Sequence, residues 1–363
     1  MGLEIGIVGL PNSGKTTLFN ALTAAHAAVA GYPFSTVEPN VGVVPLPDPR
    51  LEEVARRAGC ERTVPATVRF VDIAGLVEGA HRGEGLGNRF LAHIREVDAI
   101  AHTVRCFEDP DVARAAPGTD PARDIAIVNT ELMLADLESA ERRISGIAKA
   151  ARSGDKEKQA ELTVLENVRR GLQEGRPVRS QELSPEEMAL LSPLFLLTAK
   201  PVIYVANLGE DQLPEGGEAA EAVRQAAQAE GAECVAFCAK LEAELEELDP
   251  ADLRDFLEGY GLEELGLHQL VAASFRLLGL ITFFTTESGE CRAWPLRRGT
   301  RAAQAAGKIH SDMEAGFIRA EVLPFEEFMR HGSLQAAREA GALRSEGRDY
   351  QVQDGDVIRF RFH

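Results

Sequence analysis

The segment Gly9-Leu10-Pro11-Asn12-Ser13-Gly14-Lys15-Thr16 constrains the fold of this chain more than any other part of its sequence. It matches the pattern G-x-x-x-x-G-K-[ST] and lies between one run that predicts a strand and another that predicts a helix. In such a turn, backbone N–H groups and the helix N-terminus bind phosphate oxygens. The segment therefore predicts a phosphate-binding loop for a nucleoside triphosphate.

The residue types in this loop suit phosphoryl chemistry. Lys15 is expected to reach the β- and γ-phosphates and to neutralise charge that develops on them, and the Thr16 hydroxyl is expected to bind Mg²⁺. The nucleotide contacts expected from this loop are Asn12, Ser13, Gly14, Lys15, Thr16 and Thr17.

A second segment, Asp72-Ile73-Ala74-Gly75, follows the predicted strand at 68–71. We expect Asp72 to support Mg²⁺ through water and the Gly75 N–H to contact the γ-phosphate. The pattern D-x-x-G is weak alone, but its position after the phosphate loop makes it informative. Thr36, between the two segments, is the candidate for a second Mg²⁺-binding hydroxyl, and an ordinary loop residue is the alternative. The residues expected to act in catalysis are Lys15, Thr36 and Gly75.

Two further segments predict where the base binds. Asn207-Leu208-Gly209-Glu210 follows the predicted strand at 202–206, where G proteins carry N-K-x-D, and Cys238-Ala239-Lys240 stands where they carry S-A-K. The Asp of N-K-x-D accepts both guanine N–H donors, whereas Glu210 is one methylene longer and is expected to collide or turn away. The residues expected at the base are Asn207, Leu208, Glu210, Cys238, Ala239 and Lys240.

Strands that alternate with helical stretches predict an α/β fold with a mostly parallel sheet and helices on both faces. The predicted strands cover residues 3–8, 68–73, 99–106, 202–206 and 234–237. Apolar residues at helical spacing on both sides of Ser153-Gly154-Asp155 predict an antiparallel helical hairpin. Ser184-Pro185-Glu186-Glu187 is a capping box that starts another helix.

After Gly279 the pattern predicts a small α+β domain. It comprises a strand at 280–286, a helix capped by Thr300, and a turn at 354–356 that leads into a strand at 357–362. The expected domains are a G domain of residues 1–123 and 192–279, a helical insertion at 124–191, and a C-terminal domain at 280–363. Because every phosphate and base motif ends by Lys240, removal of residues 281–363 is expected to leave nucleotide binding in place.

Charge limits the partners of the chain. The net charge is −18, and residues 281–363 are neutral, with twelve Lys+Arg and twelve Asp+Glu, so the first 280 residues carry the whole excess. A protein that coats nucleic acid is therefore not expected, nor is a DNA partner, although the neutral tail can touch RNA locally.

The apolar runs of the chain are far too short to span a membrane, and its start does not resemble a signal peptide. Five cysteines without a Cys-x-x-Cys pair argue against a disulfide framework or a zinc site. A cytoplasmic protein without a membrane partner is expected.

Taken together, these segments resemble the YchF subfamily of Obg-type P-loop NTPases. The resemblance rests on GIVGLPN (6–12), YPF (32–34), TVEPN (36–40), DIAGLV (72–77), GEGLGN (83–88), Asn207 with Glu210, and AAGKIHSD (305–312), and it covers essentially the whole chain. It implies a G domain, an inserted coiled-coil arm and a C-terminal TGS domain of ubiquitin-like β-grasp type. It also implies a preference for ATP over GTP and association with the ribosome, through the large subunit and RNA.

The sequence does not decide which residue, if any, positions the attacking water. Leu76 stands where Ras-like proteins carry a water-positioning Gln, and the family shares this substitution. Some family members place a His in the loop after residue 106, where this chain has Arg114. His81 and His102 are other candidates, although a structural role is the simpler interpretation of each.

The resemblance also implies sensitivity to oxidation. Cys234 and Cys238 are four residues apart on a predicted strand and are expected to share a face. Burial as small apolar side chains is the simpler interpretation of both.

The expected reaction is slow hydrolysis of ATP to ADP and phosphate with Mg²⁺ as cofactor, used as a nucleotide switch on the ribosome. A conventional GTPase is one alternative. A binding module that uses nucleotide only as a structural ligand is another.

Overall fold

The computed structural model describes residues 3–27, 40–76, 86–108, 118–245 and 248–363. The chain divides into two units, one of Met1–Gly42 and Arg69–Leu270 and the other of Val43–Val68 and Val271–His363. Three candidates from the sequence, Thr36, His81 and Arg114, lie outside the described residues.

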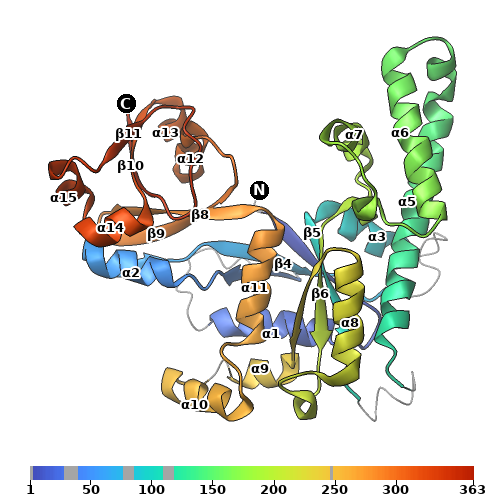
Figure 1. The fold of residues 1–363 in the computed structure, drawn as a ribbon, viewed down its shortest axis with the longest axis horizontal. Coiled ribbons are helices and arrows are strands. Elements are labelled where there is room, and N and C mark those ends of the chain that lie inside the picture. The colour runs from blue at the N-terminus through green and yellow to red at the C-terminus, as the bar shows by residue number, and fades with distance from the viewer. Residues whose placement is uncertain (1–2, 28–39, 77–85, 109–117, 246–247) are drawn as a thin grey trace. The chain divides into compact units, whose positions relative to one another are not determined.

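One six-stranded sheet has the order β2-β4-β1-β5-β6-β7 (Figure 1). Strand β1 pairs in parallel with β4 and β5, β5 pairs in parallel with β6, and β6 with β7, as the alternating sequence pattern predicted. The strands are β1 (Glu4–Val8), β2 (Val41–Pro45), β4 (Thr67–Asp72), β5 (Ala99–Arg105), β6 (Val202–Asn207) and β7 (Glu233–Phe237).

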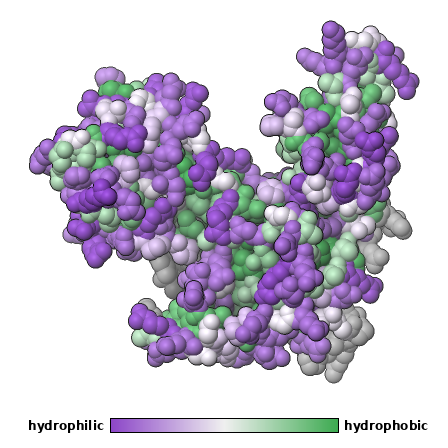
Figure 2. Space-filling view, viewed as in Figure 1, coloured by the Kyte–Doolittle hydropathy of each residue, from purple (hydrophilic) through white to green (hydrophobic). Residues whose placement is uncertain are grey.

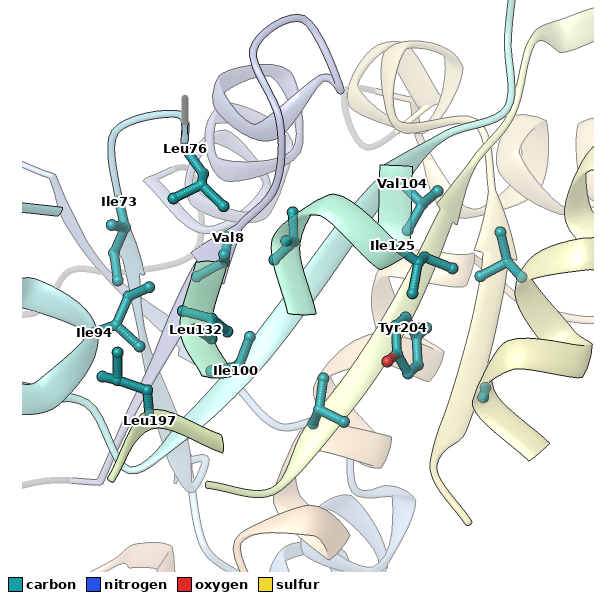
Figure 3. Packing of buried hydrophobic residues seen from close by; sticks show 14 of the residues in the cluster. Val8, Ile73, Leu76, Ile94, Ile100, Val104, Ile125, Leu132, Leu197 and Tyr204 are labelled. Carbon is teal, nitrogen blue, oxygen red and sulfur yellow. The ribbon is translucent and has the colours of Figure 1, made fainter. Parts of the chain in front are cut away.

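Helices α3 (Leu86–Glu96), α5 (Pro121–Arg152) and α8 (Gly217–Ala229) pack against this sheet through one apolar core. Val8, Leu76, Val104, Ile125 and Tyr204 belong to this core, which joins strands, helix α5 and the turn after β4 (Figure 3). The first unit also contains α1 (Lys15–Ala27) and two helices that share a separate apolar cluster, α9 (Ala239–Leu245) and α10 (Pro250–Tyr260). Helix α11 (Gly266–Leu277) begins in the first unit and ends in the second. Short 3₁₀ turns are η4 (Leu197–Ala199) and η5 (Glu210–Gln212).

Helices α5 (Pro121–Arg152) and α6 (Lys156–Gln173) form the predicted hairpin, which we call the arm (Figure 1, green). The chain reverses at Ser153-Gly154-Asp155, where Gly154 has φ +96° and Asp155 caps α6 through the N–H groups of Glu157 and Lys158. The Ser184–Glu187 capping box starts α7 (Pro185–Leu191), also as predicted. Short 3₁₀ turns, η2 (Val178–Ser180) and η3 (Ser192–Leu194), complete this region.

Asp136 anchors α5 to the segment that returns from the arm to the sheet. Its carboxylate is fully buried and accepts hydrogen bonds from the backbone N–H groups of Leu197 and Thr198 and from the Thr198 hydroxyl, each at 2.7 Å. Burial raises the pKa of Asp136, and the three donors oppose that shift. The carboxylate therefore supplies acceptors for the backbone N–H groups at the start of η4, which are buried in the core.

A second polar group ties the arm to the sheet. Arg179 donates to Glu230 at 2.7 Å and to Asn129 at 3.1 Å, and Asn129 donates to the hydroxyl of Tyr204 on β6. Because Arg179 is almost completely buried, its charge is compensated inside this group rather than by water.

The second unit contains a mixed six-stranded sheet in the order β11-β10-β12-β8-β9-β3. Its first and last C-terminal strands, β8 and β12, pair in parallel, and helix α12 covers the core of this unit. This arrangement agrees with the expected β-grasp type. The elements are α2 (Pro49–Ala58), β3 (Arg62–Val64), β8 (Leu280–Glu287), β9 (Glu290–Arg297), α12 (Ala302–Ile309), α13 (Ser311–Ala315), β10 (Phe317–Leu323), α14 (Phe325–His331), α15 (Leu334–Glu339), β11 (Arg344–Glu346) and β12 (Val357–Phe362).

Thr300 does not cap α12, so this expectation was wrong. The N-cap residue is Arg301, whose backbone N–H donates to the Gln304 side chain, while the Thr300 hydroxyl donates to the Arg297 carbonyl in the preceding turn. A Thr hydroxyl that closes a local turn is no longer available to a helix that starts later.

Residues 43–68 belong to the same unit as the C-terminal region. Strand β3 pairs in parallel with β9, and Arg50 on α2 forms an ion pair with Asp354 at 2.9 Å. Removal of residues 281–363 would therefore strip β3 and α2 of their partners. That truncation is therefore not a clean test of nucleotide binding. The expectation that binding survives it stays a prediction, as does the three-domain division.

In the part of the chain that the structure describes, no helix is both long and apolar enough to cross a bilayer.

We predict that Asp136→Ala lowers the free energy of unfolding of the first unit by roughly 3–5 kcal/mol, because three buried donors lose their acceptor. Glu138→Ala on the same helix is the matched control, since this exposed carboxylate forms a surface ion pair with Arg142, which contributes under about 1 kcal/mol. Urea unfolding followed by circular dichroism measures both variants. Equal stability of the two variants would contradict the anchoring role of Asp136.

Candidate functional site

The predicted phosphate loop runs between β1 and α1. Asn12 and Gly14 adopt left-handed backbone conformations, with φ +63° and +88°, and α1 begins at Lys15. The Lys15 ammonium group donates to the Leu10 carbonyl at 2.7 Å and so closes the turn on itself. The N–H groups of the first turn of α1 have no intrahelical acceptor and are available to an anion.

Two glycines in the loop are required by close neighbours. A Cβ on Gly14 would overlap the side-chain amide nitrogen of Asn207, and its positive φ also disfavours other residues. A Cβ on Gly9 would overlap the Thr103 carbonyl oxygen on β5. These contacts fix the loop against the edges of β5 and β6.

Lys15 carries a positive charge in a largely desolvated position. The residue is only 7% exposed, and burial lowers the pKa of its ammonium to about 8, while the nearby Asp72 carboxylate raises it. The Thr16 hydroxyl donates to Asp72 at 3.3 Å. Burial raises the pKa of Asp72, against the opposing effects of Thr16 and Lys15.

The oxygen atoms of Thr16 and Asp72 fit a Mg²⁺ site. A hydroxyl and a carboxylate side by side are hard ligands of the kind that Mg²⁺ prefers, and such a site is usually completed by phosphate oxygens and water. Thr36, the other proposed hydroxyl, lies outside the described residues.

Gly75 lies beside the Lys15 ammonium group, as the predicted γ-phosphate contact requires. A Cβ at Gly75 would be 3.2 Å from the Lys15 nitrogen and 3.4 Å from Pro11. The side chain of the next residue, Leu76, is fully buried next to Val8 in the core (Figure 3). Its backbone N–H donates to the Gly9 carbonyl at 3.1 Å. Substitution of Leu76 therefore affects the core first and is not a clean test of catalysis.

Asn207 acts as a brace between the phosphate loop and the base-binding segments. Its side-chain nitrogen donates to the Ser13 carbonyl at 3.1 Å, and its side-chain oxygen accepts from the Ala239 N–H at 3.2 Å. The sequence predicted that Asn207 lies at the base. Each end of the amide instead has a backbone partner, because Asn207 is buried between the two segments and only 4% exposed.

The side chain of Leu208 is buried in the core, which does not fit the prediction that it lies at the base. The residue is 2% exposed and packs with Ala206 and Ala220 in the core. Its backbone N–H donates to the Phe237 carbonyl on β7, which holds the residue in line with the sheet and turns its side chain inward.

Glu210 is exposed and turned toward α10. Its carboxylate accepts a hydrogen bond from the Tyr260 hydroxyl at 2.7 Å, and this bond raises the pKa of Tyr260. The Tyr260 ring stacks on Phe256 at a centroid distance of 4.7 Å, which fixes the hydroxyl in place. The expectation that the longer Glu210 carboxylate turns away agrees with this contact.

Sequence reasoning missed Tyr260 and Gln212. The Gln212 side chain accepts from the Gly209 N–H at 2.7 Å and donates to the Cys106 carbonyl at 2.9 Å, which ties the base segment to the end of β5. The spacing Gly209-x-x-Gln212 is a recognisable local signal. No local signal connects Tyr260 with Glu210, which precedes it by fifty residues.

The Cys238-Ala239-Lys240 segment begins α9. Cys238 and Ala239 are buried, and Lys240 is exposed to solvent. Cys238 does not share a face with Cys234, because β7 ends at Phe237 and the two side chains pack in different apolar clusters. Burial raises the pKa of Cys234 to about 11 and also raises that of Cys238, so neither is a ready thiolate.

His102 lies on β5 in the core and packs against the Tyr204 ring at 5.3 Å. It is 2% exposed, and burial lowers the pKa of its imidazole to about 3. A neutral, packed histidine agrees with the structural interpretation of this residue.

The fold and the loop geometry define a P-loop NTPase with a G domain. A family model described as "50S ribosome-binding GTPase" matches residues 4–150. A model of the YchF GTPase C-terminal region, described as a protein of unknown function, matches residues 280–363.

The chain is 48% identical to the "Ribosome-binding ATPase YchF" of Bacillus subtilis (strain 168) over the full length of both. It is 50% identical to the protein of that name in Escherichia coli O157:H7, again over the full length of both. It also resembles the solved structure of the Schizosaccharomyces pombe YchF GTPase, with 32% identity, a TM-score of 0.90, and coverage of 99% of this chain and 98% of that one. The chain belongs to the YchF family.

We predict that nucleotide binding takes up protons at mildly alkaline pH. The ammonium group of Lys15 loses its proton above pH 8 in the free chain, and an adjacent triphosphate raises its pKa. Between about pH 8 and 10 the bound chain therefore holds more protons than the free chain, so affinity falls as pH rises.

Titration calorimetry with ATP in buffers of different ionisation enthalpy measures this proton uptake directly. The exposed Lys308, in the other unit, provides a control as Lys308→Ala, which should behave as the unmodified chain. Constant affinity without proton exchange across this pH range would contradict the buried, charged state of Lys15.

Proposed function

We propose that this chain is a ribosome-associated, Mg²⁺-dependent ATPase that hydrolyses ATP to ADP and phosphate as a slow nucleotide switch. The observation that carries the proposal is the convergence of the Lys15 ammonium, the Thr16 hydroxyl and the Asp72 carboxylate at the start of α1. The names of the bacterial relatives, ribosome-binding ATPases, support both the reaction and the partner. Association through the large subunit and RNA is part of the proposal.

Each residue of the loop has a proposed task. Lys15 compensates charge on the β- and γ-phosphates, and the Gly75 N–H holds the γ-phosphate beside it. Thr16 and Asp72, with Thr36, would hold Mg²⁺, and Mg²⁺ would supply further charge compensation on the phosphate oxygens. None of these residues is placed as a general base for the attacking water, so we expect slow turnover.

Slow turnover is also expected from the residue after Gly75. Where Ras-like proteins place a water-orienting Gln, this chain has Leu76, which is fully buried in the core. A leucine in this position cannot orient the attacking water. We therefore propose that hydrolysis times a conformational change and that stimulation of the reaction comes from a partner.

The hydrogen bond between Tyr260 and Glu210 supports a preference for ATP over GTP. Guanine would need a carboxylate that accepts from its N1–H and its N2 amine, whereas the Glu210 carboxylate is engaged by Tyr260. Adenine has an acceptor at N1 and needs no carboxylate there. The conventional GTPase remains the alternative, and the name of the Schizosaccharomyces pombe relative, a YchF GTPase, favours it.

We predict that Lys15→Ala lowers ATP affinity at least about tenfold and abolishes measurable turnover, because a charge-assisted contact of roughly 1.5–3 kcal/mol is lost. Phosphate release with and without ribosomes measures the effect, with Lys308→Ala as the control. Ribosome-stimulated release by the unmodified chain supports the switch. Unchanged turnover in Lys15→Ala would contradict the proposed role of Lys15 at the phosphates. If the unmodified chain releases no phosphate, a module that uses nucleotide only as a structural ligand is favoured.

We predict that Tyr260→Phe raises GTP affinity several-fold and leaves ATP affinity unchanged, because the freed Glu210 carboxylate can turn toward the base. The substitution removes only the hydroxyl and keeps the ring on Phe256. Tyr350→Phe is the matched control, since its hydroxyl also donates to a carboxylate, that of Asp356 at 2.8 Å, in the other unit. Competition binding with a fluorescent nucleotide gives both affinities. An unchanged ratio of GTP to ATP affinity in Tyr260→Phe would remove Tyr260 from base selection.

A further inference from the structure

The end of the arm is basic in an otherwise acidic chain. We call residues 142–158, on both sides of the turn between α5 and α6, the arm tip. It contains three of the seven lysines of the chain, and six basic residues stand against two acidic ones. The basic residues are Arg142, Arg143, Lys149, Arg152, Lys156 and Lys158; the acidic ones are Asp155 and Glu157.

The rest of the arm has the opposite charge. Residues 121–141 and 159–173 contain three Lys+Arg and seven Asp+Glu, a net charge of −4, whereas the tip has a net charge of +4 from six minus two. The charge therefore changes sign along one helical hairpin, which general solubility does not require. In the space-filling view, hydrophilic residues gather at this end of the arm (Figure 2).

Ion pairs account for only half of the basic residues. Arg143 and Lys158 share Glu161, at 2.5 and 2.7 Å, and Arg142 pairs with Glu138. Lys149, Arg152 and Lys156 are exposed, and the structure shows no ion pair for them among the described residues. Three positive charges thus project into solvent around one turn.

Helix stability explains some of these residues but not all. Lys149 and Arg152 lie in the last turn of α5, where cations interact favourably with the helix dipole. Lys156 begins α6, where a cation is unfavourable, and it gains no ion pair in return among the described residues. Because Lys156 opposes the helix dipole and no ion pair offsets this cost, we infer that it serves binding rather than stability.

The surface of the tip suits phosphate groups better than a protein partner. None of the large apolar side chains that the structure exposes, in the part of the chain it describes, lies in the tip, so the tip offers no anchor of the kind that dominates protein interfaces. Gly146 and Gly154 face open space and allow a backbone to approach closely.

The arm also separates these charges from the acidic body. The sixteen residues from the Asp136 anchor to Arg152 span about 24 Å of helix. This length exceeds the screening distance of about 8 Å at physiological ionic strength, so the negative body does not cancel the attraction of the tip.

We propose that the arm tip is a binding surface for the phosphate backbone of RNA, with Lys149, Arg152 and Lys156 as its contacts. The proposal rests on the proposed association with the ribosome and names the part of the chain that makes contact. Binding of this kind depends on charge rather than on sequence, and it releases counterions, so it weakens steeply with salt.

The test compares two triple variants of the full chain. Lys149→Glu with Arg152→Glu and Lys156→Glu reverses the charge of the tip. Arg123→Glu with Arg170→Glu and Arg176→Glu makes the same change of charge on exposed residues away from the tip, two on the arm and one just after it. Anisotropy of a labelled single-stranded RNA of about 20 nucleotides, titrated at several salt concentrations, gives affinity and its salt dependence. Circular dichroism and ATP turnover confirm that both variants keep the fold and the nucleotide site.

We expect the tip variant to bind this RNA at least about tenfold more weakly and to lose about two units from the slope of log affinity against log salt concentration. The control variant should change affinity by less than about threefold, and both should hydrolyse ATP as the unmodified chain does. Ribosome co-sedimentation should fall in the tip variant alone.

Equal RNA affinity of the two triple variants would overturn the proposal. Loss of ribosome co-sedimentation without loss of RNA affinity would also overturn it, because the tip would then contact a ribosomal protein. Neither result depends on ATP turnover, so failure of this proposal is separable from failure of the proposed function.

Discussion

The buried ammonium group of Lys15 is the constraint on which the nucleotide site depends. A positive charge with 7% exposure needs compensation within the protein: the Leu10 carbonyl accepts its hydrogen bond, and the negative charge of the nearby Asp72 carboxylate favours the charged ammonium group. The loop must therefore fold back on itself, which requires the left-handed conformation of Gly14 and the close approach of Gly9 to β5. The same geometry aims the start of α1 at the space where a triphosphate would bind.

The Asn207 brace extends this constraint to the segments that were predicted to bind the base. Because its amide bonds to both Ser13 and Ala239, the phosphate loop and the segment that begins α9 cannot move independently. Gln212 adds a link to the end of β5, and Glu210 adds one to α10 through Tyr260. The phosphate loop and the segments predicted to bind the base are therefore linked by side-chain hydrogen bonds.

Local patterns in the sequence predicted the parts of the fold that local physics determines. The phosphate loop, the parallel strands, the hairpin turn at Ser153-Gly154-Asp155 and the Ser184–Glu187 capping box all lie where they were predicted. Each depends on residues close together in the sequence, such as a glycine with positive φ or a capping side chain. The family resemblance added the arrangement of the C-terminal sheet.

What the sequence did not predict depends on contacts between distant segments. The three-residue strand β3 is stable only through its pairing with β9, which lies in a distant part of the sequence, so no periodicity could reveal it. Leu208 was assigned to the base by analogy with a lysine, but an apolar side chain at the end of β6 gains more from burial in the core. Cys234 and Cys238 were expected to lie on one face of a strand. They do not, because β7 ends one residue before Cys238.

We propose that the chain selects ATP, since the Glu210 carboxylate, which would have to recognise guanine, is bonded to Tyr260. Titration calorimetry of the unmodified chain with Mg²⁺-ATP and Mg²⁺-GTP, under identical conditions, measures this selectivity. We expect ATP to bind about ten- to a hundredfold more tightly, the effect of one missing charged contact of roughly 1–3 kcal/mol. Equal or tighter binding of GTP would refute this selectivity and favour a conventional GTPase.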